Sequence, residues 1–460
     1  MSPPDTIKSL AAFLVTSNSL QSQSALALSS GPGDWPRILF FGSEPPGTGG
    51  AGSIYFHRLL RDVPASHLFV ATHRPLPDDV ERLSCRYLRQ SLPLSSLENT
   101  RLWKLRFLAR LAGLPRLVSL DELDRTIPFV PDVVVTLMQD SLMYETASRY
   151  AVTRGYPLCV FVHDLAHGFE PLPRVFQALR QRADRRFLAR SASIVCVSDG
   201  MKAYLREKWG LESDVILPPA PDHPVSTPPE ACRTLKHPDR LTIGYAGGLH
   251  YGYGEQLLRI APALRRAKAH VMVFGALPTG RLAALLNESD VLSFRGRLPT
   301  PEDAWREISD NCDATFLPYA NPPGSFAEQY RTHFPSKLAE MTYLGLPVIV
   351  TGPADASGVS WFLERPGSAL CVQNDDLVAL ERELSALRTD SSRRVSMAQT
   401  ALSFAPTFSA DLARGRLAEV FGVRTLSQCF ARTIEDGQFS ASCTSARTRR
   451  RSHGDHRPLA

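Results

Sequence analysis

Short runs of β-branched and aromatic residues alternate with longer stretches of helical periodicity along most of the chain. The runs are apolar on both faces, and such runs separated by helices are typical of parallel sheets covered on both sides. The predicted strands are 37–41, 67–71, 132–137, 158–162, 193–198, 241–246, 270–274, 291–294, 314–317, 347–351 and 369–372.

The alternation is interrupted at residues 218–239, which hold seven prolines and few apolar residues. This composition between two periodic regions predicts an interdomain linker. We therefore expect an α/β protein with two tandem doubly wound, Rossmann-like parallel-sheet domains that face a cleft. The other expected segments follow from composition and periodicity. They are a disordered extension at 1–35, a first domain at 36–217, a second domain at 240–406, a final helix at 407–424 and a disordered basic tail at 425–460.

Composition narrows the function classes. With 460 residues, 43% of them hydrophobic and 21% charged, the chain can form two cores of an ordinary soluble protein. A net charge of +6 is mild and gives little support for nucleic-acid binding. The eight cysteines include no C-x-x-C pair, which favours reduced cysteines in a cytoplasmic protein over disulfides or zinc sites. We expect neither a membrane-spanning helix nor a secretory signal.

The loop after the first predicted strand, GSEPPGTGGAG at 42–52, satisfies G-x-G-x-x-G with Gly47, Gly49 and Gly52. A dinucleotide site needs the first glycine directly after the strand and an acidic residue about 20 positions later. Here residues 43–46 intervene, and the next strand ends at 71–73 without a carboxylate. The loop is alternatively a flexible turn, or a close-approach loop whose amides and following helix N-terminus favour an anion.

The second half carries sharper signals. Gly247 and Gly248 follow a predicted strand and precede a predicted helix at 255–266, so their amides are candidates for a phosphate. The stretch FPSKLAEMTYLGLPVIV at 334–350 predicts a helix with Ser336 as N-cap, followed by a strand. Lys337 lies in the first turn of this helix, which predicts an anion site with both a dipole and a full charge.

Glu340 follows Lys337 by three residues and shares its helix face. A carboxylate there can accept hydrogen bonds from a pair of sugar hydroxyls. The alternative is that Lys337 and Glu340 form an ordinary surface ion pair, which contributes little.

In combination and in this order, four stretches resemble the GT-B glycosyltransferases, specifically the retaining group 1 enzymes that use nucleotide-sugar donors. They are 42–52, 191–210, 243–258 and 334–350, and the resemblance covers about residues 37–424. It implies transfer of a sugar from a nucleoside-diphosphate sugar to an acceptor hydroxyl, with retention of configuration. No metal or further cofactor is expected, because the sequence shows no cluster of His, Asp or Cys ligands and Lys337 with the glycine-loop amides could stabilise the leaving diphosphate. The acceptor would be a glycan, a lipid-linked molecule or a small molecule.

The resemblance also implies roles for residues at matching positions. Lys337 would bind the diphosphate and Glu340 the nucleotide ribose, and His163 would contact the transferred sugar; a lone histidine there is alternatively a structural residue. The implied catalytic residues are His163, Asp164 and Lys337, and the implied donor-binding residues are Gly49, Gly50, Gly247, Gly248, Ser336, Lys337 and Glu340.

Two departures from the family pattern concern charge. The family's E-x7-E pair lacks its first glutamate, because Thr332 stands there, and Glu328 is the candidate substitute. The basic pair expected after the glycine loop of the second domain is also missing, because Gly248 and Tyr253 stand about there, with Arg297, Arg331 and His250 as candidate replacements. If the reaction inverted instead, Glu44 or Asp164 would be the candidate general base.

The departures leave other function classes open. One is a sugar-nucleotide epimerase of the same architecture, and another is a non-catalytic nucleotide-sugar or glycan-binding protein. A dehydrogenase is the third.

Two segments of the first domain are basic. Residues 101–118 hold five cations and no acid, and 174–190 hold six arginines against Asp184. Basic amphipathic segments are typical of peripheral contact with an anionic membrane, here at its inner face and beside a lipid-linked acceptor. The alternative is a pair of ordinary helices with solvated faces.

Overall fold

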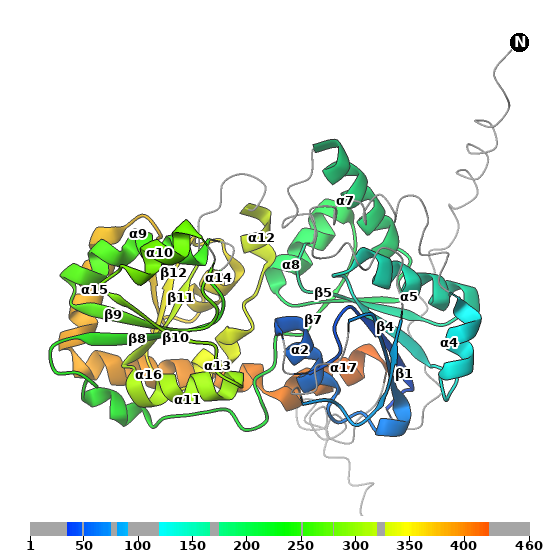
Figure 1. The fold of residues 1–460 in the computed structure, drawn as a ribbon, viewed down its shortest axis with the longest axis horizontal. Helices are drawn as coiled ribbons and strands as arrows, with labels where there is room; N and C mark the ends of the chain where they lie inside the picture. The colour runs from blue at the N-terminus through cyan, green and yellow to red at the C-terminus, as the bar shows by residue number, and fades with distance from the viewer. Residues whose placement is uncertain are drawn as a thin grey trace, which may run out of the picture.

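A computed structural model describes residues 35–47, 50–74, 81–90, 119–165, 174–249, 252–278, 280–319 and 327–422. Two α/β lobes lie side by side (Figure 1). Gly49, His250 and the segment 101–118 lie outside the described residues, as do most of the expected extension and the expected tail.

The N-terminal lobe is built on a seven-stranded parallel sheet in the order β3-β2-β1-β4-β5-β6-β7. Its first strand is buried on both faces, because Ile38 and Phe40 enter one apolar cluster while Leu39 and Phe41 enter another. The strands are β1 (Ile38–Gly42), β2 (Leu68–Thr72), β3 (Arg86–Arg89), β4 (Val133–Leu137), β5 (Leu158–Val162), β6 (Ser193–Cys196) and β7 (Asp214–Val215).

The C-terminal lobe has a six-stranded parallel sheet in the order β10-β9-β8-β11-β12-β13. In both lobes the first strand is central and the strand order reverses beside it. Ligands of such sheets bind beyond the carboxyl ends of the strands at this reversal. The strands are β8 (Leu241–Ala246), β9 (Ala269–Phe274), β10 (Leu292–Gly296), β11 (Ala314–Pro318), β12 (Val348–Thr351) and β13 (Leu370–Val372).

Helices cover both sheets, so the predicted pair of doubly wound parallel-sheet domains is confirmed (Figure 1). Among the described residues, no helix combines the length and apolar character needed to cross a membrane. In the N-terminal lobe the helices are α2 (Ala51–Leu60), α4 (Leu120–Thr126), α5 (Ser141–Arg154), α7 (Arg174–Leu188) and α8 (Asp199–Tyr204). After the linker they are α9 (Tyr253–Arg266), α10 (Arg281–Asn287), α11 (Pro301–Asn311), α12 (Ala327–Thr332), α13 (Lys337–Tyr343), α14 (Ser357–Leu363), α15 (Leu377–Thr389), α16 (Ser391–Phe404) and α17 (Ala410–Val420).

The last helix leaves the lobe that precedes it in the sequence. Figure 1 shows α17, in orange, beneath the N-terminal lobe, where it packs against α2. The Arg414 guanidinium donates a hydrogen bond to the Arg58 carbonyl (3.1 Å) and pairs with Asp62 (2.8 Å). The chain therefore crosses between the lobes twice, once through the linker and once before α17.

Candidate functional site

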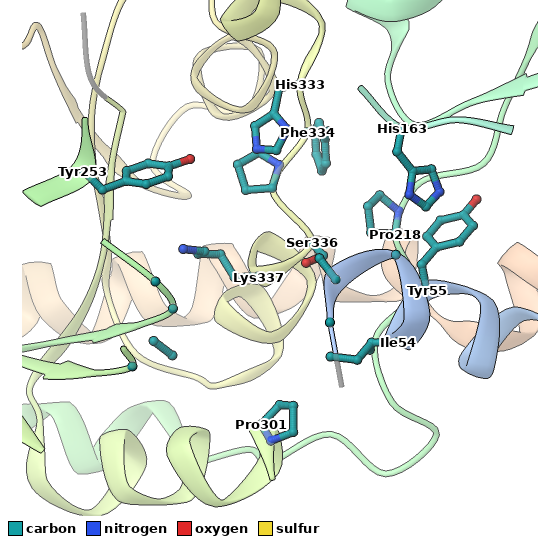
Figure 2. Close-up of a pocket in the computed structure, with 18 of the residues that line it drawn as sticks. Ile54, Tyr55, His163, Pro218, Tyr253, Pro301, His333, Phe334, Ser336 and Lys337 are labelled. Carbon is teal, nitrogen blue, oxygen red and sulfur yellow. The ribbon is translucent and has the colours of Figure 1, made fainter. Parts of the chain in front are cut away.

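A cavity of about 1230 Å³ lies between the lobes, and both lobes line it. Figure 2 shows Lys337 and Tyr253 on one side of it and His163 and Tyr55 on the other. The residues that enter the argument below are Gly50, His163, Asp164, Gly247, Gly248, Tyr253, Arg297, Gln329, His333, Ser336, Lys337 and Glu340.

Helix α13 places the first cation in the cavity. Leu338 and Met341 are fully buried and anchor the helix in the core of its lobe, which leaves position 337 at the cavity wall. Ser336 precedes the helix as predicted, but its backbone is already helical and its side chain makes no capping hydrogen bond. The helix has only seven residues, so the charge of Lys337 is the main electrostatic feature of this end.

The ammonium of Lys337 is held by neutral aromatic groups. Its Nζ donates a hydrogen bond to the Tyr245 hydroxyl (3.0 Å), and it lies 4.3 Å and 5.2 Å from the ring centres of Tyr245 and Tyr253. Burial lowers the pKa of Lys337 to about 7, although the charge of Glu340 opposes this shift. A cation that is held by a hydroxyl and two π faces remains available to an anionic ligand.

Glu340 pairs with Arg58 of the other lobe and not with its sequence neighbour Lys337. Its Oε1 accepts a hydrogen bond at 2.6 Å from Nη1 of Arg58, which comes from α2 in the other lobe. Glu340 is only 8% exposed, so the surface ion pair with Lys337 is not what forms. Its Oε2 is buried and has no hydrogen-bond partner among the described residues. One carboxylate oxygen thus remains for a ligand in the cavity.

The glycine loop after β8 contributes space more than amides. The Gly247 N–H donates to the Phe274 carbonyl (2.8 Å), so this amide is already engaged. Gly247 has a φ of 140°, and a Cβ there would lie 2.6 Å from Nζ of Lys337. A side chain at position 247 would therefore displace the Lys337 ammonium, while Gly248 is exposed and lines the cavity.

His163 lies at the carboxyl end of β5, on the opposite wall. Its ring stacks on Phe56, with centres 5.6 Å apart and planes at 12°, and meets Tyr55 edge-on at 4.3 Å. Burial among these rings lowers the pKa of His163 to about 4, so the imidazole is neutral at neutral pH. Its Nε2 is buried without a hydrogen-bond partner among the described residues.

Asp164 joins the two lobes. Its Oδ1 accepts hydrogen bonds from Nδ1 of His333 (2.9 Å) and Nε2 of Gln329 (2.8 Å), both from the C-terminal lobe. Burial opposes ionisation of Asp164, but these hydrogen bonds and the nearby histidines lower the pKa of Asp164 below its ordinary value. Because Asp164 holds Nδ1 of His333, the other ring nitrogen of His333 remains for the cavity that this residue lines.

Two of the candidate replacements for the missing charges lie elsewhere. Glu328 is directed to Tyr204 (3.5 Å) and Lys208 (3.9 Å), so it does not stand in for the missing glutamate. Arg331 pairs with Asp355 (2.6 Å) on the surface. Arg297 is the described candidate that lines the cavity.

The opening loop meets the cavity through the start of α2. Gly50 precedes this helix, and Gly50, Ala51 and Gly52 line the cavity wall. Glu44, the other candidate general base, forms an ion pair with Arg74. Within the described residues, no group of three or more His, Cys, Asp or Glu side chains is arranged to hold a metal ion.

The sequence did not reveal Arg58, His333 or Gln329 as site residues. Each reaches the cavity region through a contact between the lobes, and such contacts have no spacing signature in the sequence. For Arg58, the one local sign is a cation on the helix that follows the glycine-rich loop.

Comparisons with known proteins agree with this architecture. Residues 50–220 match the family model described as "Glycosyl transferase 4-like domain". A sequence search of curated proteins gives no match.

Several solved structures share the fold. HepE of Anabaena, in complex with UDP and glucose, is 14% identical with a TM-score of 0.62 over 84% of this chain and 100% of HepE. Sucrose-phosphate synthase from Thermosynechococcus elongatus is 16% identical with a TM-score of 0.61 over 86% of this chain and 98% of that enzyme. WaaG, a glycosyltransferase involved in lipopolysaccharide biosynthesis, is 15% identical with a TM-score of 0.54 over 84% of this chain and 99% of WaaG.

The chain therefore has the GT-B fold, and residues 50–220 in its N-terminal lobe match a glycosyltransferase domain model. The resemblance to GT-B glycosyltransferases predicted from the sequence is confirmed. These comparisons do not favour an epimerase, a binding protein or a dehydrogenase.

Proposed function

We propose that this protein transfers a sugar from a nucleoside-diphosphate sugar to an acceptor hydroxyl, with the donor on the C-terminal lobe. The observation that carries the proposal is that Lys337 and Glu340 line the same interlobe cavity, each held by a different partner. The ammonium of Lys337 donates its hydrogen bond to a neutral hydroxyl and not to a carboxylate, so its charge is available to a ligand. One helical turn away, Glu340 has a carboxylate oxygen without a hydrogen-bond partner among the described residues. A cation for the diphosphate and an acceptor for the ribose hydroxyls together suit a diphosphate–ribose unit.

In this proposal Lys337 binds the donor diphosphate and stabilises the charge that develops on it as the bond to the sugar breaks. Glu340 accepts hydrogen bonds from the ribose hydroxyls. The neutral His163 contacts the sugar from the opposite wall. Closure of the lobes around both substrates excludes water and brings the acceptor to the sugar.

We further propose that the reaction retains the anomeric configuration and needs no metal. Retention is proposed from the resemblance to the retaining group 1 enzymes. Glu44 pairs with Arg74 and Asp164 binds His333 and Gln329, so either would have to act as general base through its second oxygen. Lys337 supplies a positive charge where a metal would otherwise neutralise the diphosphate. NMR of the product anomer, from an assay run with and without a chelator, checks both statements.

Nucleotide release is the direct test. The purified protein is incubated with UDP-, GDP-, ADP- and CDP-sugars, with and without pools of glycan, lipid-linked and small-molecule acceptors. We expect release to depend on acceptor, and K337A to lower turnover by about a hundredfold or more. K236A, which removes an exposed lysine in the linker, is the matched control and should keep the wild-type rate.

Other outcomes contradict the proposal in different ways. Conversion of a nucleotide-sugar without acceptor would indicate an epimerase, and binding without turnover would indicate a binding protein. Unchanged turnover in folded K337A would remove the role of the lysine. The membrane contact of residues 101–118 stays a prediction, which co-sedimentation with anionic liposomes checks.

A further inference from the structure

Arg58 occupies the place where the two lobes and the linker meet. Its side chain is 8% exposed, although it stands in the last turn of α2 and carries a full charge. Nη1 donates to Glu340 Oε1 at 2.6 Å and to the Pro219 carbonyl of the linker at 2.8 Å. Nη2 donates to Glu302 on α11 at 3.2 Å. One guanidinium thus ties the N-terminal lobe to two helices of the C-terminal lobe.

The contact leaves the two oxygens of Glu340 in different states. Oε1 is taken by Arg58, whereas Oε2 is buried without a hydrogen-bond partner among the described residues. A carboxylate fixed in this way loses little conformational entropy when a ligand hydroxyl arrives. The fixed oxygen belongs to the C-terminal lobe, but the group that fixes it belongs to the N-terminal lobe.

Arg58 also keeps two site groups apart. Lys337 and Glu340 stand three residues apart on α13, a spacing at which opposite charges pair. Without Arg58, the buried carboxylate would lose its cation and the nearest replacement on the same helix is Lys337. Such a pair would withdraw both the lysine and the glutamate from a donor.

We propose that Arg58 is a positioning residue for the donor ribose: by holding Oε1 of Glu340 it presents Oε2 to the ribose hydroxyls, and it does so only while the lobes are together. The inference rests on the proposed function, because it assumes that the cavity binds a nucleoside diphosphate. It adds a residue of the acceptor-side lobe to donor recognition.

The test measures ribose recognition and not merely affinity. UDP, GDP, ADP and CDP are titrated calorimetrically into the full-length protein, each beside its 2′,3′-dideoxy analogue, and the tightest pair is kept. For the wild type we expect the ribonucleotide to bind at least about tenfold tighter than the analogue, as hydrogen bonds to a charged group warrant. In R58Q this ratio should fall toward one. A merely structural role for Arg58 would weaken both nucleotides alike and leave the ratio unchanged.

Matched variants separate the causes. R61Q removes an exposed arginine of the same helix end, paired with Asp222 at 2.7 Å, and should keep the wild-type ratio. In E340Q the preference for the ribonucleotide over its dideoxy analogue should disappear. Adding R58Q to E340Q should lower this preference no further. Circular dichroism establishes folding. R58K is measured alongside. Its single ammonium cannot donate to both Glu340 and the Pro219 carbonyl as the guanidinium does, so the ratio should be lower than in the wild type.

The outcomes are distinguishable. A wild-type ratio in any folded Arg58 variant, with E340Q having lost it, would overturn this inference alone. A wild-type ratio near one would remove the role of Glu340 and this inference with it. No binding of any nucleotide would overturn the proposed function itself.

Discussion

Burial brings the pKa of Lys337 close to neutral pH. Its ammonium lies against two tyrosine rings, and burial lowers the pKa of Lys337 to about 7. At neutral pH the free protein is therefore a mixture of protonated and neutral lysine. A diphosphate favours the protonated form, so binding raises the pKa of Lys337 and draws a proton from solution.

This linkage predicts a pH dependence with a definite sign. Above pH 7 the free lysine is mostly neutral and must take up a proton to bind, so the affinity for a nucleoside diphosphate should fall as pH rises. The limit is about tenfold per pH unit until the pKa of the bound state is reached. Calorimetry between roughly pH 7 and 9, repeated in buffers of different ionisation heat, measures the affinity and the proton uptake together.

K337M provides the control for this titration. It keeps an apolar side chain of similar length but removes the proton, so its weaker affinity should show no such decline. A wild-type affinity that stays flat over the same range would contradict a lysine that titrates near neutrality and contacts the diphosphate.

At the scale of single residues, the sequence pointed to two groups that share one helix but missed the distant residues that hold them. Lys337 and Glu340 share α13, and helical spacing places both on one face. Their partners, Tyr245 and Arg58, lie 92 and 282 positions away in the sequence. Local periodicity carries no information on such pairs, because tertiary packing alone brings them together.

At the scale of elements, the apolar runs located every strand that is buried on both faces. Among the described strands, the two that they missed are β3 and β7, which lie at the edges of the N-terminal sheet. Arg86 and Arg89 at the ends of β3 are exposed, and β7 has only two residues. Edge strands are often short and charged, which removes the apolar signal while limiting aggregation.

Helix α17 is the element whose placement the sequence left open, and one buried cation holds it. Arg414 has a side chain that is 9% exposed and pairs with Asp62, Asp222 and Asp411 at 2.8, 2.7 and 2.8 Å. Asp62 and Asp411 are exposed and remain solvated without Arg414, but the buried Arg58 carbonyl would lose its donor and the partly buried Asp222 its cation, which costs about 1 to 3 kcal/mol. R414M should therefore lower the free energy of unfolding by about this amount, measured by urea denaturation.

R416M is the matched control on the same helix. Arg416 is exposed and donates to the Val215 carbonyl at 3.1 Å, so its loss should change stability by less than about 1 kcal/mol. Equal effects of the two substitutions would show that α17 is held by its apolar face, through residues such as Leu417 and Phe421, and not by Arg414.

At the scale of the whole molecule, the lobes are joined by polar contacts spread along the cavity. Arg58 binds Glu340 near the linker, and Asp164 binds His333 and Gln329 further along. A third contact lies between α8 and α12, which Figure 1 shows side by side, where the Ser198 hydroxyl donates to the Thr332 carbonyl at 2.7 Å. The Thr332 position, where the family's glutamate is missing, thus serves the lobe contact.

Gly200 offers a way to test whether this closed arrangement is the active one. It lies in the first turn of α8, and a Cβ there would fall far inside contact distance of the Arg331 carbonyl in the other lobe. Within its own helix an alanine is favoured over glycine by about 1 kcal/mol, so harm from G200A must come from the contact between lobes. We expect small-angle scattering to show a larger radius of gyration for G200A. Turnover should fall by about a hundredfold, because a displacement of the reacting groups by about 1 Å has an effect of this size.

G415A on α17, where a Cβ meets nothing within 4 Å, is the control and should change neither quantity. Full activity of G200A with an enlarged radius would mean that transfer does not need the lobes this close, whereas loss of activity at an unchanged radius would place the damage in α12 and not in closure.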